Sequence, residues 1–170
     1  MFLRYIKRTF KLVGLVVLVL LFTRTIIIEP GAVNGRSMET TFLDNEMFLV
    51  NKLALFFRTP ERGDIVQAKG LDPGEVIIKR VIGLPGEELA IHDNHIYLIG
   101  ADGSETLLQE PYLDEGVITL SVNGEPTRFT KIPDHAYFLV GDNRTMSVDS
   151  RASGAFHRSD IYGLVMKLPF

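Results

Sequence analysis

The sequence predicts a mostly β fold. We expect an antiparallel sheet folded into a barrel-like core, a smaller inserted β sub-lobe, and one N-terminal transmembrane helix before them. One apolar run without charges lies near the N-terminus. The rest of the chain consists of short apolar runs between turn-forming residues, and none keeps a helical period of 3.6 residues for three turns. The 170 residues suffice for one domain with a small appendage.

Residues 1–28 are predicted to form a short basic segment and a single transmembrane anchor. Residues 12–23 carry no charge, and extension to Ile28 reaches about 17 residues, the shortest length that spans a bilayer. Arg24 interrupts this stretch, but its long side chain can extend toward lipid headgroups. A cleaved secretory signal is one alternative, although no small-x-small cleavage site follows the run. A buried helix of a globular domain is the other.

The charges are distributed unevenly along the chain. The formal net charge is −3, yet the first 24 residues contain five basic residues and no acidic ones. This basic start places the N-terminus in the cytoplasm and residues 29–170 outside. An acidic body of this kind is not expected to bind nucleic acid. The absence of cysteine excludes thiol catalysis, iron–sulfur clusters and cysteine-ligated zinc.

Residues 29–170 are predicted to form an extracytoplasmic β-rich domain. Turn signals such as Asp72-Pro73-Gly74 and Leu84-Pro85-Gly86 separate its apolar runs. The inserted sub-lobe is expected at about residues 84–135, where turn-forming residues are most frequent. The predicted strands are residues 47–50, 64–68, 76–82, 88–91, 95–99, 117–122, 135–140 and 161–168.

Residues 53–57 are five consecutive apolar residues between Lys52 and Arg58. A core strand or short helix would bury them. A loop that enters the membrane next to the anchor would expose them to lipid. The sequence leaves both interpretations open.

Three segments could carry chemistry, although each also has a purely structural interpretation. Ser37 follows a glycine bend that can expose its hydroxyl. Lys79 shares a strand face with Ile77 and Val81, so burial of that face would desolvate its amine and lower its pKa. The loop of residues 141–151 is rich in turn formers and charges, and Asp149 and Arg151 can pair across it.

Taken together and in this order, the segments resemble the type I signal peptidases. The similarity covers nearly the whole chain, including the basic N-terminus with one apolar anchor. Four ordered motifs in one chain are far more specific than any one of them alone. The matching motifs are Ser37-Met38 with a following threonine and large apolar residue, Arg62-Gly63-Asp64-Ile65-Val66, Lys79-Arg80-Val81-Ile82-Gly83-Leu84-Pro85-Gly86, and residues 141–151.

The resemblance implies a hydrolase that uses a serine and a lysine, without cofactor or metal. Ser37 aligns with the nucleophile and Lys79 with the general base. Ser147 aligns with the hydroxyl that holds the lysine amine, and Asp149 and Arg151 with the pair that braces the loop. A neutral amine can take the serine proton only if its pKa is depressed from about 10.4.

The sequence departs from the family pattern at two positions. Thr40 stands where the family usually has proline, which would stiffen the chain behind the nucleophile. Gly35 stands where some members have a serine whose hydroxyl helps to form the oxyanion hole. We expect the hole to depend on the backbone N–H of Ser37 instead.

The resemblance further implies an endopeptidase anchored in the plasma membrane that removes signal peptides from exported preproteins on the outer face. A bacterial membrane is favoured over a mitochondrial one, and the oligomeric state is left open. The substrate would bind as an added strand. Apolar walls would leave room only for small side chains near the cleaved bond. The residues expected to form these walls are Val33, Met38, Phe42, Ile77 and Ile78.

Other functions remain as alternatives. The chain could be a processing peptidase specialised for one pilin-like substrate, or a non-catalytic, membrane-tethered β-domain. A self-cleaving repressor is disfavoured because an anchor stands where its DNA-binding domain would be. His135 could serve a Ser-His-Asp triad, and His92 with His95 could share a metal, but solvated turn residues are the simpler interpretation.

Overall fold

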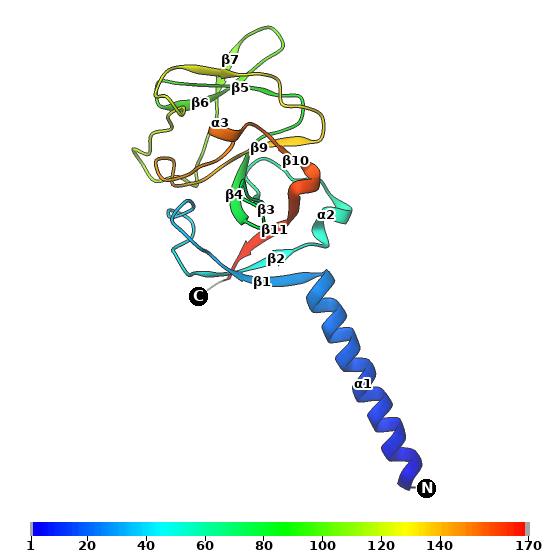
Figure 1. Ribbon diagram of the computed structural model, residues 1–170. Coiled ribbons are helices and arrows are strands. Elements are labelled where there is room, and N and C mark those ends of the chain that lie inside the picture. The colour runs from blue at the N-terminus through cyan, green and yellow to red at the C-terminus, as the bar shows by residue number, and fades with distance from the viewer. Residues whose placement is uncertain (1, 169–170) are drawn as a thin grey trace.

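The N-terminal segment forms a 25-residue helix, α1 (Phe2–Ile26), which projects away from a β body (Figure 1). The computed structural model describes residues 2–168 and, within α1, the side chains of residues 4–21. In this described part of the chain, none of the helices combines the length and the apolar character needed to cross a bilayer. Parts of two predicted regions lie outside the described residues. They are residue 1 and the side chain of Arg24 in the predicted anchor region, and residues 169–170 at the end of the predicted β-rich domain.

The main sheet has seven antiparallel strands in the order β1-β2-β11-β3-β4-β9-β10. Its central strands are buried on both faces, and every residue of β9 is buried. On β2 and β3 burial alternates, because one face packs on the core and the other faces solvent. The strands are β1 (Ile28–Ala32), β2 (Met47–Asn51), β3 (Ile65–Lys69), β4 (Val76–Gly83), β9 (Ala136–Val140), β10 (Phe156–His157) and β11 (Ile161–Lys167).

A second sheet of four antiparallel strands is inserted in the chain between β4 and β9, within the predicted sub-lobe. Its order is β7-β6-β5-β8, and it lies on the far side of the β body from α1 (Figure 1). The strands are β5 (Glu88–His92), β6 (His95–Ile99), β7 (Glu105–Leu107) and β8 (Thr127–Phe129). The predicted mostly β, antiparallel fold with an inserted sub-lobe is therefore confirmed.

The two sheets share one core. Ile82 of β4 and Phe138 of β9 pack in the same buried cluster as Leu89 of β5 and Ile96 of β6. A separate cluster lies under the turn that follows β1 and contains Val33, Met38, Phe42, Phe48, Val50 and Ile78. This second cluster supports the segment that carries Ser37.

Two predictions made from the apolar runs need correction or refinement. Residues 117–122 do not form a strand and join neither sheet, because Thr119 and the carbonyl of Leu120 instead accept hydrogen bonds from arginines of the loop of residues 141–151. The other predicted strands all overlap observed ones. Residues 53–57 contain the short helix α2 (Ala54–Phe57), whose phenylalanines are exposed rather than buried in the core. The remaining short elements are α3 (Ser150–Ser153) and η1 (Arg158–Asp160).

Candidate active site

The fold brings Ser37 and Lys79 together from segments 42 residues apart. The Nζ atom of Lys79 donates a hydrogen bond to Oγ of Ser37 at 2.7 Å. Lys79 lies on β4 opposite Val66 of β3, and only 3% of its surface is exposed. Ser37 lies in a tight turn after β1, where the N–H of Glu39 donates to the carbonyl of Arg36. The alternation of β4 directs the lysine inward, and the turn presents the serine to it.

The environment of Lys79 favours the neutral amine. Burial is the main cause that lowers the pKa of Lys79, because a desolvated ammonium loses its hydration. The carboxylates of Asp149 and Glu75 oppose this shift, whereas Arg151 adds to it. The net direction is downward. A lysine with a lowered pKa, in hydrogen-bond contact with a hydroxyl, is suited to remove the hydroxyl proton.

The backbone around Ser37 is held on one side and free on the other. Its carbonyl accepts a hydrogen bond from the N–H of Asn143 at 3.0 Å. Its own N–H has no hydrogen-bond partner among residues 2–168 and can serve a negatively charged oxygen. The N–H of Gly35 is not free in this way, since it donates to Asp44 at 2.8 Å. Gly35 has a φ of +100°, a conformation that favours glycine.

The loop of residues 141–151 approaches the nucleophile turn very closely. A Cβ atom at Gly141 would overlap both the hydroxyl of Ser147 and the carbonyl oxygen of Ser37. Glycine at this position therefore permits the contact between the two segments. The N–H of Asp142 points at the buried sulfur of Met38, 3.4 Å away.

Asp149 and Arg151 form the predicted ion pair within this loop. Arg151 Nε donates to one carboxylate oxygen of Asp149 at 2.8 Å and Nη2 to the other at 2.9 Å. Asp149 also accepts from the N–H of Gly141 at 3.1 Å. Burial alone would raise the pKa of Asp149, but the ion pair with Arg151 holds this pKa below its ordinary value. The pair remains charged and braces the loop from inside.

The Ser147 hydroxyl does not contact the Lys79 amine in the way the resemblance implies. Its Oγ atom is buried and makes no well-formed hydrogen bond within the described chain, although it lies near enough to the Asp149 carboxylate to help lower the pKa of that group. Lys79 instead donates to Ser37. Ser147 nevertheless lies at the site, because its Oγ occupies the space beside Gly141.

A second buried ion pair, which the sequence did not single out, connects the nucleophile turn with the loop. Arg80 Nε donates to Asp142 Oδ1 at 2.8 Å, and Thr41 donates to the same carboxylate. The guanidinium of Arg80 lies 3.8 Å from the ring centroid of Tyr112 in the sub-lobe. The alternation of β4 places Arg80 on the face opposite Lys79, but the partner lies 62 residues away. No local pattern identifies such a partner.

The Ser37–Lys79 pair opens into a cleft of about 340 Å³. Val33, Ile77 and Ile78, which were expected to contact substrate, line it. Met38 and Phe42 do not, and this expectation needs correction: both are completely buried in the core behind the cleft. The sequence missed five other apolar lining residues, namely Ala32, Phe48, Val76, Met146 and Val148.

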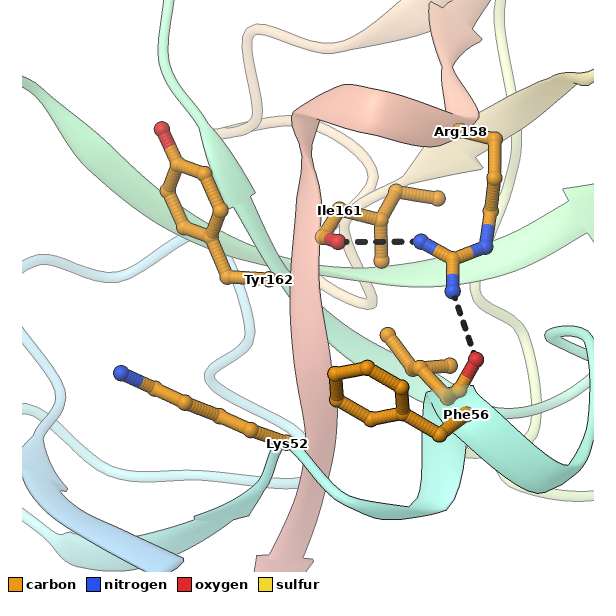
Figure 2. A pocket seen from close by; sticks show the side chains of 6 residues that line it. Lys52, Phe56, Arg158, Ile161 and Tyr162 are labelled. Atoms are coloured by element: carbon orange, nitrogen blue, oxygen red, sulfur yellow. Dashed lines mark hydrogen bonds between the residues drawn. The ribbon is translucent and has the colours of Figure 1, made fainter. Parts of the chain in front are cut away.

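A second pocket, of about 390 Å³, lies between α2 and β11 and shares no lining residue with the cleft (Figure 2). Phe56 and Ile161 form its apolar part, and Lys52 and Arg158 its cationic part. The Arg158 guanidinium donates to the carbonyls of Leu55 and Ile161, as the dashed lines show (Figure 2). None of its lining residues is a candidate nucleophile or general base of the expected chemistry.

The histidines take no part in the cleft. His135 lies in the turn before β9 with a φ of +63°, and its carbonyl accepts from the N–H of Arg158. His92 stacks on Tyr97 and contacts Glu105. Within residues 2–168 there is no group of three or more side chains that could hold a metal ion.

Comparison with known proteins identifies the family of this chain. The family model described as signal peptidase, peptidase S26, matches residues 6–168. Signal peptidase I V of Bacillus subtilis strain 168 is 38% identical over 165 residues, covering 94% of this chain and 96% of its own length. Signal peptidase I P of Bacillus subtilis subsp. natto is 36% identical over 152 residues, 88% of this chain and 82% of its own.

A solved structure extends the agreement to the fold. The crystal structure of a signal peptidase I from Enterococcus faecalis V583 superposes with a TM-score of 0.52 at 26% identity, covering 64% of this chain and 98% of that one. The family model spans almost all of this chain, and the Bacillus relatives exceed 30% identity over most of it. The chain therefore belongs to the signal peptidase family, peptidase S26.

Proposed function

We propose that this protein is a membrane-anchored serine endopeptidase that removes signal peptides from exported preproteins, with Ser37 as nucleophile and Lys79 as general base. The observation that carries the proposal is the 2.7 Å hydrogen bond between Lys79 Nζ and Ser37 Oγ. The amine is almost fully buried, and its pKa is lowered mainly by that burial. Burial of a lysine amine costs folding free energy, and a buried lysine with a lowered pKa against a serine hydroxyl in a cleft is a candidate catalytic group.

The reaction follows from these groups. The neutral amine of Lys79 takes the proton of Ser37 while Oγ attacks the scissile carbonyl carbon. The oxyanion that forms accepts a hydrogen bond from the backbone N–H of Ser37, which has no other partner within residues 2–168. The Lys79 ammonium then gives its proton to the departing amine, and an acyl-enzyme remains. Water, deprotonated by the same lysine, hydrolyses the ester and restores Ser37.

The cleft supports binding of the substrate as an extended strand. On the side of β4 that faces β9, pairing begins only at Arg80, so Val76 to Ile78 have an open edge. The backbone N–H and carbonyl of Asn34 have no partner in the described chain either. A substrate strand can pair with both segments. Val33, Ile77 and Ile78 stand along this path and leave space for small side chains before the cleaved bond.

Membrane attachment is the second part of the proposal. The apolar run of α1 and the basic residues before it support an anchor with the N-terminus in the cytoplasm and the β body outside. The β body begins directly after α1, because the carbonyl of Ile27, the residue after the helix, already accepts a hydrogen bond from the N–H of Lys52 at 3.0 Å. Two phenylalanines of α2 are strongly exposed close to this junction, Phe56 at 77% and Phe57 at 81%. Their position supports contact with the outer leaflet.

The proposal is tested with the full chain in lipid vesicles and a generic preprotein whose cleavage site has small residues. We expect cleavage by the wild type, and none by Ser37→Ala or Lys79→Ala. Lys79→Arg should also be inactive, because a guanidinium stays protonated. Lys131→Ala, which changes an exposed lysine, is the matched control and should cleave normally. Turnover by Lys79→Arg would exclude the lysine base.

The same assay separates the remaining alternatives. Cleavage of several unrelated preproteins would support a general signal peptidase. Cleavage of one substrate only would favour a specialised processing enzyme. An inactive wild type that is correctly folded would favour the non-catalytic domain.

A further inference from the structure

Residues 118–122 have an inverted pattern of burial. The polar residues Thr119 and Ser121 are 2% and 7% exposed, whereas Leu120 and Val122 are 40% and 62% exposed. Ile118 is also exposed. An extended segment with apolar residues toward solvent and polar residues inside is opposite to what burial of apolar surface favours.

The inversion is fixed by buried polar contacts. The hydroxyl of Thr119 accepts a hydrogen bond from Arg144 at 2.5 Å, and its N–H donates to the carbonyl of Asn94 at 2.8 Å. Arg151 donates to the carbonyl of Leu120 at 3.0 Å. Since these groups would lose their partners if the segment turned over, and the Thr119 hydroxyl would lose a buried one, Leu120 and Val122 are held outward.

These outward side chains line a groove of about 330 Å³ together with Val148. Val148 also lines the catalytic cleft, so the groove continues the cleft along the loop of residues 141–151. Met146, which is exposed, lines the cleft next to it. A chain that passes the Ser37–Lys79 pair along this loop enters the groove.

The groove also has open backbone. The N–H groups of Leu120, Ser121 and Val122 donate to no residue in the described part of the chain. An extended peptide could therefore pair with this edge while its side chains contact Leu120 and Val122. The lipid surface around α1 is a poor occupant, because the sub-lobe lies on the far side of the body (Figure 1).

We propose that Leu120, Val122 and Val148 form a subsite for the substrate residues that follow the cleaved bond, and that this subsite favours apolar side chains there. The inference rests on the proposed Ser37–Lys79 cleavage. In that reaction the walls formed by Val33, Ile77 and Ile78 hold the residues before the bond. The groove beyond Val148 then receives the first residues of the released chain.

The test uses two preproteins that are identical up to the cleaved bond. One continues with leucine or valine at its second and third residues, and the other with serine. We expect Leu120→Asn and Val122→Thr to lower kcat/KM about three- to tenfold for the apolar preprotein, mainly through KM, and to leave the serine preprotein unchanged. Leu107→Asn is the matched control, because Leu107 is 39% exposed on β7, in the same sub-lobe.

Two results would overturn the subsite. One is an equal loss for both preproteins, and the other is no loss for the apolar one. Thermal unfolding of each variant checks that Thr119 and Ser121 still hold the segment. Wild-type cleavage of the serine preprotein tests the proposed reaction separately. If the wild type does not cleave this preprotein, the subsite can still be tested by binding. A labelled apolar peptide should bind Ser37→Ala more tightly than the double variant Ser37→Ala/Leu120→Asn, and equal binding would overturn the subsite.

Discussion

The backbone carbonyl of Ser37 accepts a hydrogen bond from the backbone N–H of Asn143 at 3.0 Å. This bond joins the nucleophile turn to the loop that carries Ser147, Asp149 and Arg151. The position of the serine hydroxyl therefore depends on a segment more than 100 residues away in the chain. Mutations in that loop should change catalysis without touching Ser37 or Lys79.

Gly141 is the most sensitive position of this junction. A methyl group there would overlap the Ser37 carbonyl oxygen and the Ser147 hydroxyl. We expect Gly141→Ala to lower kcat/KM at least tenfold and to cost about 1–3 kcal/mol in the free energy of unfolding. Gly103→Ala, at a positive φ but with open space, is the control: it should cost stability and leave activity unchanged. Normal activity of Gly141→Ala would mean that the junction is adaptable.

Activity should rise with pH through the pKa of Lys79, because only the neutral amine can accept the serine proton. Burial lowers this pKa in the folded protein, so the rising limb should lie below the ordinary range of a lysine. The measurement is kcat/KM against pH. His135→Ala should keep the rising limb, and its disappearance in that variant would favour a histidine base.

Lys79 should also make stability depend on pH. Between its lowered folded-state pKa and the ordinary value of 10.5, the unfolded chain binds a proton that the folded chain does not. Stability contributed by this group therefore rises with pH across that window. Lys79→Met should remove this rise and increase stability at neutral pH, whereas Lys131→Met should not. Urea unfolding at several pH values measures both, and an unchanged slope in Lys79→Met would argue against a neutral buried amine.

Gly35 is expected to serve backbone geometry rather than an oxyanion hydroxyl. Its φ of +100° strains any side chain although the surrounding space is open. Gly35→Ser and Gly35→Ala should therefore lose similar amounts of stability, about 1 kcal/mol or more, and similar activity. Kinetics of the two variants give the answer: a serine variant much more active than the alanine variant would indicate that a hydroxyl can contribute here.

Thr40, which replaces the proline usual in the family, can be tested directly. Its N–H donates no hydrogen bond within residues 2–168, and its φ is not left-handed. Thr40→Pro should raise the free energy of unfolding by about 0.4–1 kcal/mol and preserve activity. Thr41→Pro is the contrast, because the N–H of Thr41 donates to Met38 at 2.8 Å and would be lost. Thermal unfolding measures both changes.

Much of the fold follows from local patterns. Apolar runs and turn-forming residues identified seven of the eleven strands, because strand burial and turn chemistry are set by neighbouring residues. The sequence did not predict the first strand, β1, or the short strands β7, β8 and β10. The position of Lys79 on the inner face also follows from the residues next to it, since alternation along a strand determines which side chains share a face. The combination of motifs identified the family, and the family comparison confirms that identification.

The errors arise where a distant segment decides the outcome. Residues 117–122 have the composition of a strand. However, Arg144 donates a hydrogen bond to the Thr119 hydroxyl and Arg151 donates one to the Leu120 carbonyl, and these bonds leave the apolar side chains of the segment facing outward. Met38 and Phe42 have suitable side chains for a substrate wall, but the core behind the cleft buries them completely.

By itself, the sequence determined the mostly β class, the positions of strands β2 to β6, β9 and β11, and the inward side of Lys79, since these depend on interactions within a few residues. Only the tertiary structure decided that Lys79 donates to Ser37 rather than to Ser147, and that Arg80 pairs with Asp142. Such contacts depend on how strands far apart in the chain are ordered in the sheet. That order is set by the packing of the whole core, so no single segment encodes it.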